Sequence, residues 1–198
     1  MTDLSGRRAL VTGGASGIGA ACATAFAAAG AQVIVADLNG DAAQALAKEI
    51  GGEAWQVDLS DTKALAELTL DVDILVNNAG VQHVSPIEEF DPERFSFILK
   101  LMLESPFLLI RAALPKMYER GYGRIINLSS AHGLRASAFK SAYVAAKHGL
   151  EGLSKVTALE GGPHGDTSNC INPSYVRTPL ADKQIADQAR IHGIPDSE

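Results

Sequence analysis

The sequence contains little cysteine and no clustered positive charge. Its two cysteines, Cys22 and Cys170, lie among apolar or small residues without metal-ligand spacing, so we expect free thiols and no metal site. Free thiols are typical of a reducing cytoplasm. The 17 lysine and arginine residues are scattered and the net charge is -6, which argues against a nucleic-acid partner.

Long apolar runs are absent as well. No uninterrupted apolar stretch reaches the ~18 residues that span a bilayer. Residues 1–10 contain charge but lack the apolar core of a signal peptide. The sequence therefore predicts a soluble, cytoplasmic protein with no membrane partner.

Short β-rich runs alternate with helical stretches along the chain. The predicted strands are 7–12, 31–36, 53–57, 73–77, 123–128 and 167–171. The predicted helices are 17–29, 41–50, 61–68, 92–119 and 141–160. The strands are continuously apolar, as expected when helices cover both faces of a sheet. We predict one domain over residues 1–198, an α/β fold with a doubly wound parallel sheet in three α/β/α layers.

A glycine-rich loop joins the first predicted strand to the first predicted helix. It reads Thr12-Gly-Gly-Ala-Ser-Gly-Ile-Gly19. Glycines permit a tight turn close to a pyrophosphate, and the helix N-terminus offers free N–H groups and a positive dipole end. Glycine-rich loops are common, but here the flanking strand and helix supply the required context. We predict a Rossmann-type dinucleotide site with cofactor contacts by Gly13, Ser16, Gly17, Ile18 and Gly19.

Asp37 closes the second predicted strand. A carboxylate at this place can accept hydrogen bonds from the adenosine ribose hydroxyls and would repel a 2′-phosphate. We therefore expect NAD rather than NADP as the cofactor. The alternative is a solvated turn aspartate before Asn39-Gly40.

The residues suited to proton transfer follow the fifth predicted strand. Tyr143 and Lys147 share one helix face at i and i+4, and Ser130 ends the preceding strand. An ammonium group beside a phenol stabilises the phenolate and is expected to lower the pKa of Tyr143. Such a tyrosine can take a proton from an alcohol as hydride leaves, while the Ser130 hydroxyl holds the same oxygen. A Tyr–Lys pair on an ordinary helix surface is the alternative.

Together these motifs resemble the short-chain dehydrogenase/reductase family. The resemblance rests on Thr-Gly-x-x-x-Gly-x-Gly, on Asn77-Asn-Ala-Gly80 after the fourth strand, and on Tyr-x-x-x-Lys with its upstream serine. It implies an NAD-dependent oxidoreductase with Ser130, Tyr143 and Lys147 as catalytic residues. It also implies cofactor contacts by Asp58, Leu59, Asn78, Ala79, Gly80, Tyr143, Lys147, Pro173, Val176 and Thr178.

The family usually has a catalytic asparagine on the long helix, where this chain has Met102. Pro106, four residues later, has no N–H, so the Met102 carbonyl loses its helical partner. In the family a backbone carbonyl near this point helps to hold a water in contact with the lysine. We expect Met102 to keep this role through its main chain, with Lys147 as the water's other partner. A helix kink without a chemical role is the alternative.

The residues around Tyr143 predict a rim suited to a small carboxylate. The loop after Ser130 contains His132, Arg135 and Lys140 and no acidic residue. Four segments, 81–86, 130–134, 140–149 and 178–184, are similar to bacterial D-3-hydroxybutyrate dehydrogenases. The resemblance implies that the substrate carboxylate is held by Gln82, His132, Lys140 and Gln184, with Ser130, Tyr143 and Tyr175 as further substrate contacts.

The implied reaction is oxidation of (R)-3-hydroxybutyrate to acetoacetate with NAD, as in ketone body metabolism, by a homo-oligomer. One alternative keeps the chemistry with another substrate, such as a 3-oxoacyl thioester or a polyol. Another is a nucleotide-binding protein without turnover. Family members continue with a further helix and a last strand that supply much of a tetramer interface. We expect this chain to lack both and to retain the dimer interface formed by helices 92–119 and 141–160.

Overall fold

The computed structural model describes residues 3–174 and residue 176. Its strands are β1 (Arg8–Thr12), β2 (Gln32–Asp37), β3 (Glu53–Gln56), β4 (Ile74–Asn77), β5 (Gly123–Leu128) and β6 (Asp166–Ile171). Its α-helices are α1 (Gly17–Ala28), α2 (Gly40–Ile50), α3 (Thr62–Ala66), α4 (Pro92–Leu99), α5 (Ser105–Arg120) and α6 (Ser141–Gly161). None of the helices in this part of the chain combines the length and the hydrophobicity needed to cross a bilayer.

The strands form one six-stranded sheet in the order β3-β2-β1-β4-β5-β6. Every neighbouring pair is parallel. The chain begins at the centre of the sheet and builds outward in both directions, so the strand order reverses between β1 and β4. Loops leaving these two strands diverge and open a crevice at their carboxyl ends. The predicted doubly wound parallel sheet is confirmed.

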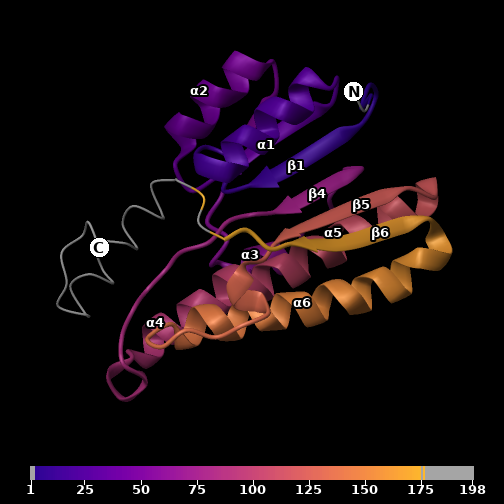
Figure 1. The fold of residues 1–198 in the computed structure, drawn as a ribbon. Coiled ribbons are helices and arrows are strands. Elements are labelled where there is room, and N and C mark those ends of the chain that lie inside the picture. Colours follow the sequence, from indigo (N-terminus) through magenta and orange to yellow (C-terminus); the bar gives the residue numbers. More distant parts are fainter. Residues whose placement is uncertain (1–2, 175, 177–198) are drawn as a thin grey trace.

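Helices cover both faces of the sheet. Figure 1 shows α1 and α2 on one side and α5 and α6 on the other. The side chains of β1 alternate between these layers: Leu10 packs in a cluster with residues of α3 and α5, whereas Ala9 and Val11 pack with residues of α1 and α2. All three are 0% exposed, and burial of a leucine-sized side chain contributes about 1.5–3 kcal/mol. Two apolar layers therefore hold the sheet rigidly beneath the site.

The long helix predicted over 92–119 is interrupted. A π-helical segment, Lys100–Glu104, lies between α4 and α5, and the Ser105 N–H bonds to the Lys100 carbonyl, five residues back. Pro106 stands in the first turn of α5 and has no N–H to donate. The wider turn is how the chain continues as a helix past this proline, and such bulges are frequent at functional sites.

Candidate active site

The glycine-rich loop lies directly after β1 and is built for close backbone approach. Gly13 and Gly17 have φ of +58° and +53°, a region that favours glycine. A Cβ on Gly19 would collide with the carbonyl oxygen of Gly13. The loop therefore needs glycine both to turn and to pack on the start of α1, whose free N–H groups open toward the crevice.

Asn78 and Thr12 tie the ends of β4 and β1 together. The Asn78 side-chain amide donates to the carbonyls of Thr12 and Gly13 at 2.9 and 3.0 Å. The Thr12 hydroxyl donates to the Val76 carbonyl at 3.1 Å and accepts from the Asn78 and Ala79 N–H groups at 3.0 and 3.2 Å. The Asn77-Asn-Ala-Gly80 motif, which follows the neighbouring strand β4, thus fixes the shape of the glycine loop.

A crevice of about 370 Å³ opens at this edge of the sheet. Ten of the predicted cofactor residues line it: Gly13, Ser16, Gly17, Ile18, Asp37, Asp58, Leu59, Asn78, Ala79 and Gly80. Six lining residues were not predicted: Leu38, Val57, Ser60, Val81, Phe97 and Leu101. Their position next to predicted strand ends or motifs could have identified the first four. Nothing in the sequence marks Phe97 and Leu101, which reach the crevice through the packing of α4 and the π-helical segment.

The Asp37 carboxylate makes two main-chain contacts, and its predicted role toward the adenosine ribose stays a prediction. One carboxylate oxygen accepts from the Asn39 N–H at 3.0 Å, as a turn aspartate does. The other accepts from the Ala15 N–H in the glycine loop, also at 3.0 Å. The carboxylate therefore braces the loop while facing the crevice.

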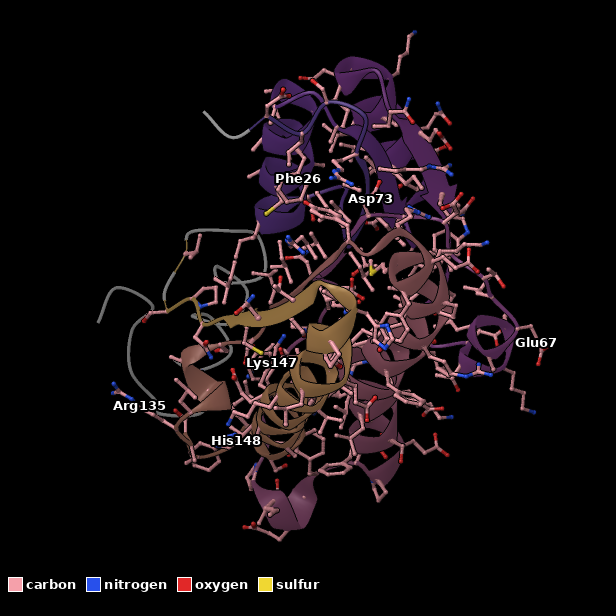
Figure 2. All side chains as sticks on the ribbon, turned by 90° about the vertical axis from the view of Figure 1, so that its right-hand side faces the viewer. Phe26, Glu67, Asp73, Arg135, Lys147 and His148 are labelled. Atoms are coloured by element: carbon pink, nitrogen blue, oxygen red, sulfur yellow. The ribbon has the colours of Figure 1, made fainter. Side chains whose placement is uncertain are left out.

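The proposed proton-transfer residues lie around the amino-terminal half of α6. Lys147 is 4% exposed, and its ammonium donates to the Leu128 carbonyl at 2.5 Å. Its Nζ lies 5.6 Å from the centroid of the Tyr143 ring. Figure 2 shows Lys147 on the inner side of α6 toward β6, whereas the neighbouring His148 lies on the outer side. The Ser130 hydroxyl lies close enough to the Tyr143 phenol to lower its pKa, so the three residues lie near one another.

Burial dominates the electrostatics of this group. Burial raises the pKa of Tyr143, and the hydrogen bond with Ser130 lowers it by less. Burial also lowers the pKa of Lys147 to about 8, with Cys170 and Glu151 acting in the opposite direction. The expectation that the pKa of Tyr143 lies below its ordinary value is therefore wrong for the chain by itself, because desolvation of the phenolate outweighs the opposing effect, which comes from Ser130.

Three side chains of the predicted carboxylate rim, Gln82, His132 and Lys140, lie within the described residues. Lys140 is 1% exposed, burial lowers the pKa of its ammonium, and no carboxylate of the described residues forms an ion pair with it. Burial, together with the nearby Lys140 charge, also lowers the pKa of His132. The Gln82 amide nitrogen is buried and, within the described part of the chain, has no hydrogen-bond partner.

A main-chain contact joins the two loops that carry this rim. The Ser85 N–H donates to the Phe139 carbonyl at 2.9 Å, which brings the segment of Gln82 to the segment of Lys140. Phe139 has φ of +66°, an uncommon conformation for a non-glycine residue. His132 is oriented by its neighbours, with Nδ1 3.4 Å from the Ser130 hydroxyl and Nε2 2.7 Å from the Ser137 hydroxyl.

Met102 occupies the position of the family's asparagine as a packing residue. Its side chain is 1% exposed in an apolar cluster with Ala142 and Ala146. A Cβ on Gly80 would lie 3.2 Å from its terminal methyl group. The proposed main-chain role of Met102 stays a prediction, and the π-helical turn that contains it is the local break that Pro106 predicted.

Several predicted residues lie away from the crevice or outside the described residues. The Pro173 carbonyl accepts from the Ala131 N–H at 3.0 Å beyond β6, and Val176 is 43% exposed. Tyr175, Thr178 and Gln184 lie outside the described residues.

The chain is similar to known proteins in sequence and in fold. The model of the short chain dehydrogenase family matches residues 7–189. A D-beta-hydroxybutyrate dehydrogenase of Cupriavidus necator is 47% identical, over 97% of this chain and 79% of its own length. Another, of Rhizobium meliloti, is 46% identical over 97% of this chain and 80% of its own length. The crystal structure of a putative NAD(P)-dependent gluconate 5-dehydrogenase from Beutenbergia cavernae, with bound NADP, superposes with a TM-score of 0.85 at 34% identity, covering 96% of this chain and 81% of that one.

Proposed function

The chain belongs to the short-chain dehydrogenase family and is an oxidoreductase; within that family, we propose that it oxidises (R)-3-hydroxybutyrate to acetoacetate with NAD. The proposal has three parts, the cofactor, the proton path and the substrate carboxylate. Each is supported by a different set of contacts.

The crevice fits a nicotinamide dinucleotide. The glycine loop is closed to side chains at Gly19 and presents the N-terminus of α1 to a pyrophosphate. The bound dinucleotide would supply the hydride acceptor. Asp37 favours NAD, because a carboxylate at the end of β2 would face the ribose hydroxyls and would repel a 2′-phosphate.

Tyr143 is the proposed proton acceptor. As the alcohol carbon gives up hydride, its hydroxyl proton moves to the phenolate oxygen of Tyr143, and the carbon–oxygen bond becomes a carbonyl. The Ser130 hydroxyl donates to the same substrate oxygen while its charge changes. The fixed Lys147 ammonium stabilises the phenolate form of Tyr143 and so offsets part of the desolvation cost.

The substrate proposal depends on one observation, the buried cationic side chain of Lys140 without a carboxylate partner among the described residues. An unpaired buried charge is costly, and a substrate carboxylate would offset that cost. The unsatisfied Gln82 amide lies on the joined loop and offers a second donor. Two relatives are named for this substrate, which supports the same assignment.

NADH formation from the two enantiomers of 3-hydroxybutyrate tests the proposal. We expect turnover of the R form, little of the S form, and loss of turnover in Tyr143→Phe with NADH binding retained. Turnover of a polyol or thioester alone would reassign the substrate, and NADH binding without turnover of any alcohol would leave a nucleotide-binding protein.

We also propose that the chain is a single-domain, cytoplasmic homo-oligomer. The two thiols are free in the structure, as suits a reducing compartment. Phe107 of α5 and Val156 and Leu159 of α6 are 48%, 51% and 79% exposed, and burying them between copies would be favourable. Light scattering of the wild type and of Leu159→Glu would detect the assembly and its loss.

A further inference from the structure

A third titratable side chain lies on the face of α6 that carries Tyr143 and Lys147. Glu151 follows Tyr143 and Lys147 at the same four-residue spacing, so the three share one side of the helix. The first two are the proposed proton-transfer pair. Glu151 contacts the segments that follow β5 and β6.

Asn172 joins Glu151 to Ser130. Its side-chain amide donates to the Glu151 carboxylate at 2.5 Å and to the Ser130 carbonyl at 2.9 Å. Both partners are oxygens that can only accept, so the NH₂ group must point toward them. One amide therefore connects a carboxylate on α6 to the main chain of a proposed catalytic residue.

This contact completes the attachment of Ser130 to the end of β6. The N–H groups on either side of it are already held: Ser129 donates to the Ile171 carbonyl at 2.8 Å and Ala131 donates to the Pro173 carbonyl at 3.0 Å. The carbonyl of Ser130 itself accepts from the Gly133 N–H at 2.8 Å and from the Asn172 side chain. Since the Ser130 hydroxyl must reach the phenol of Tyr143, its backbone position matters for the chemistry.

Glu151 also brings negative charge toward Lys147. Burial raises the pKa of Glu151, but the polar side chains of Ser129, Asn172 and Cys170 beside it outweigh burial and leave that pKa below its ordinary value. The carboxylate is therefore ionised at neutral pH. Its charge opposes the effect of burial on the pKa of Lys147, which makes no salt bridge among the described residues.

We propose that Glu151 is a positioning residue that fixes Ser130 through Asn172 and places a negative charge one helical turn from the Lys147 ammonium. The proposal rests on the proposed function for its kinetic consequences, but its structural consequences can be measured without turnover. The charged or titratable groups around Glu151 are Lys147 and Lys155 on α6 and Cys170 on β6.

Two variants separate the effect of the Glu151 charge on Lys147 from the effect of the Asn172 contact on Ser130. Glu151→Gln keeps an oxygen for the Asn172 amide but removes the charge that raises the pKa of Lys147. We therefore expect near-normal turnover at neutral pH. As the pH is raised, turnover should begin to fall at a lower pH than in the wild type. Asn172→Ala keeps the charge but removes the link from α6 to the Ser130 carbonyl, which keeps its bond from the Gly133 N–H, and we expect kcat to fall about tenfold with KM within about twofold. Glu160→Gln, an exposed carboxylate on the same helix, is the matched control and should leave both quantities unchanged.

NMR supplies readouts independent of activity. The titration of the Lys147 side chain, assigned by its loss in Lys147→Met, should have a lower midpoint in Glu151→Gln than in Glu160→Gln. Amide hydrogen exchange at residues 129–131 should be faster in Asn172→Ala than in the control. If the wild type does not oxidise 3-hydroxybutyrate but both shifts occur, the proposed function fails and the positioning role stands. The positioning role is overturned, whatever the turnover, if the Lys147 midpoint is unchanged in Glu151→Gln and the amide exchange of residues 129–131 is unchanged in Asn172→Ala.

Discussion

The Lys147 ammonium is anchored to the Leu128 carbonyl, the last main-chain acceptor of β5, at 2.5 Å. A flexible four-carbon side chain is thereby held in one place beneath Tyr143. The anchor is a neutral carbonyl, so it fixes the ammonium without neutralising it. Because the ammonium is buried, its protonation is coupled to the stability of the fold.

Lys147 predicts a pH-dependent contribution to stability. Burial lowers its pKa from 10.5 to about 8, with Cys170 and Glu151 opposing the shift. Between these two values the unfolded chain retains a proton that the folded chain has released, so this group makes the free energy of unfolding rise with pH. We expect the free energy of unfolding of the wild type, minus that of Lys147→Met, to increase as the pH rises across this window, as measured by urea denaturation at several pH values. If this quantity stays constant or decreases, the lysine is not a buried group with a lowered pKa.

Lys140 predicts a split between substrate affinity and turnover. Lys140→Met removes the proposed carboxylate contact, and a charge-assisted hydrogen bond of ~1.5–3 kcal/mol corresponds to a rise in KM of about 10- to 150-fold. We expect kcat to change much less, since the contact is remote from the reacting oxygen. Steady-state kinetics with (R)-3-hydroxybutyrate measures both.

The same substitution should weaken substrate binding but stabilise the folded chain. Lys140→Met removes a buried charge without an ionic partner among the described residues, so its Tm without substrate should be higher than that of the wild type. Arg135 lies in the same loop but is exposed, and Figure 2 shows it at the outer edge of the molecule. Arg135→Ala should change neither KM nor Tm, and an equal effect of both variants would mean that only the general charge of the loop matters.

Asp37 predicts the cofactor preference. Asp37→Asn removes the negative charge but keeps one side-chain oxygen for the Ala15 or Asn39 N–H. We expect the ratio of kcat/KM for NADP to that for NAD to rise at least ~10-fold, because the repulsion of the 2′-phosphate is lost. Asp41→Asn, at an exposed position on α2, should leave the ratio unchanged. A wild type that already prefers NADP would refute the assignment of NAD.

The sequence predicted those parts of the molecule that local chemistry determines. β1, the glycine loop and α1 follow one another in the chain, so apolar runs, required glycines and a helix start were enough to place them. The crevice wall at Phe97, the interruption of the long helix and the Glu151–Asn172 contact depend on which segments meet in space. The direction of the Tyr143 pKa was mispredicted for a related reason: i, i+4 spacing shows that an ammonium is near but does not show how deeply the phenol is buried.

Asp166 predicts a stabilising substitution far from the crevice, at the start of β6. It is 5% exposed, and within the described residues neither of its side-chain oxygens has a hydrogen-bond partner. Burial raises its pKa, with His164 and Arg124 opposing the shift. A raised carboxyl pKa means that the folded chain holds this proton more tightly than the unfolded chain, so stability present at low pH is lost as pH rises through the folded-state value.

Asp166→Asn cannot lose that proton. We expect it to raise the free energy of unfolding by roughly 1–2 kcal/mol at neutral pH and by progressively less as the pH falls toward the ordinary carboxyl range. Urea denaturation at neutral and acidic pH, with the exposed Glu88→Gln as control, measures the gain. A loss of stability at neutral pH would show that the Asp166 carboxylate is satisfied by contacts beyond the described residues.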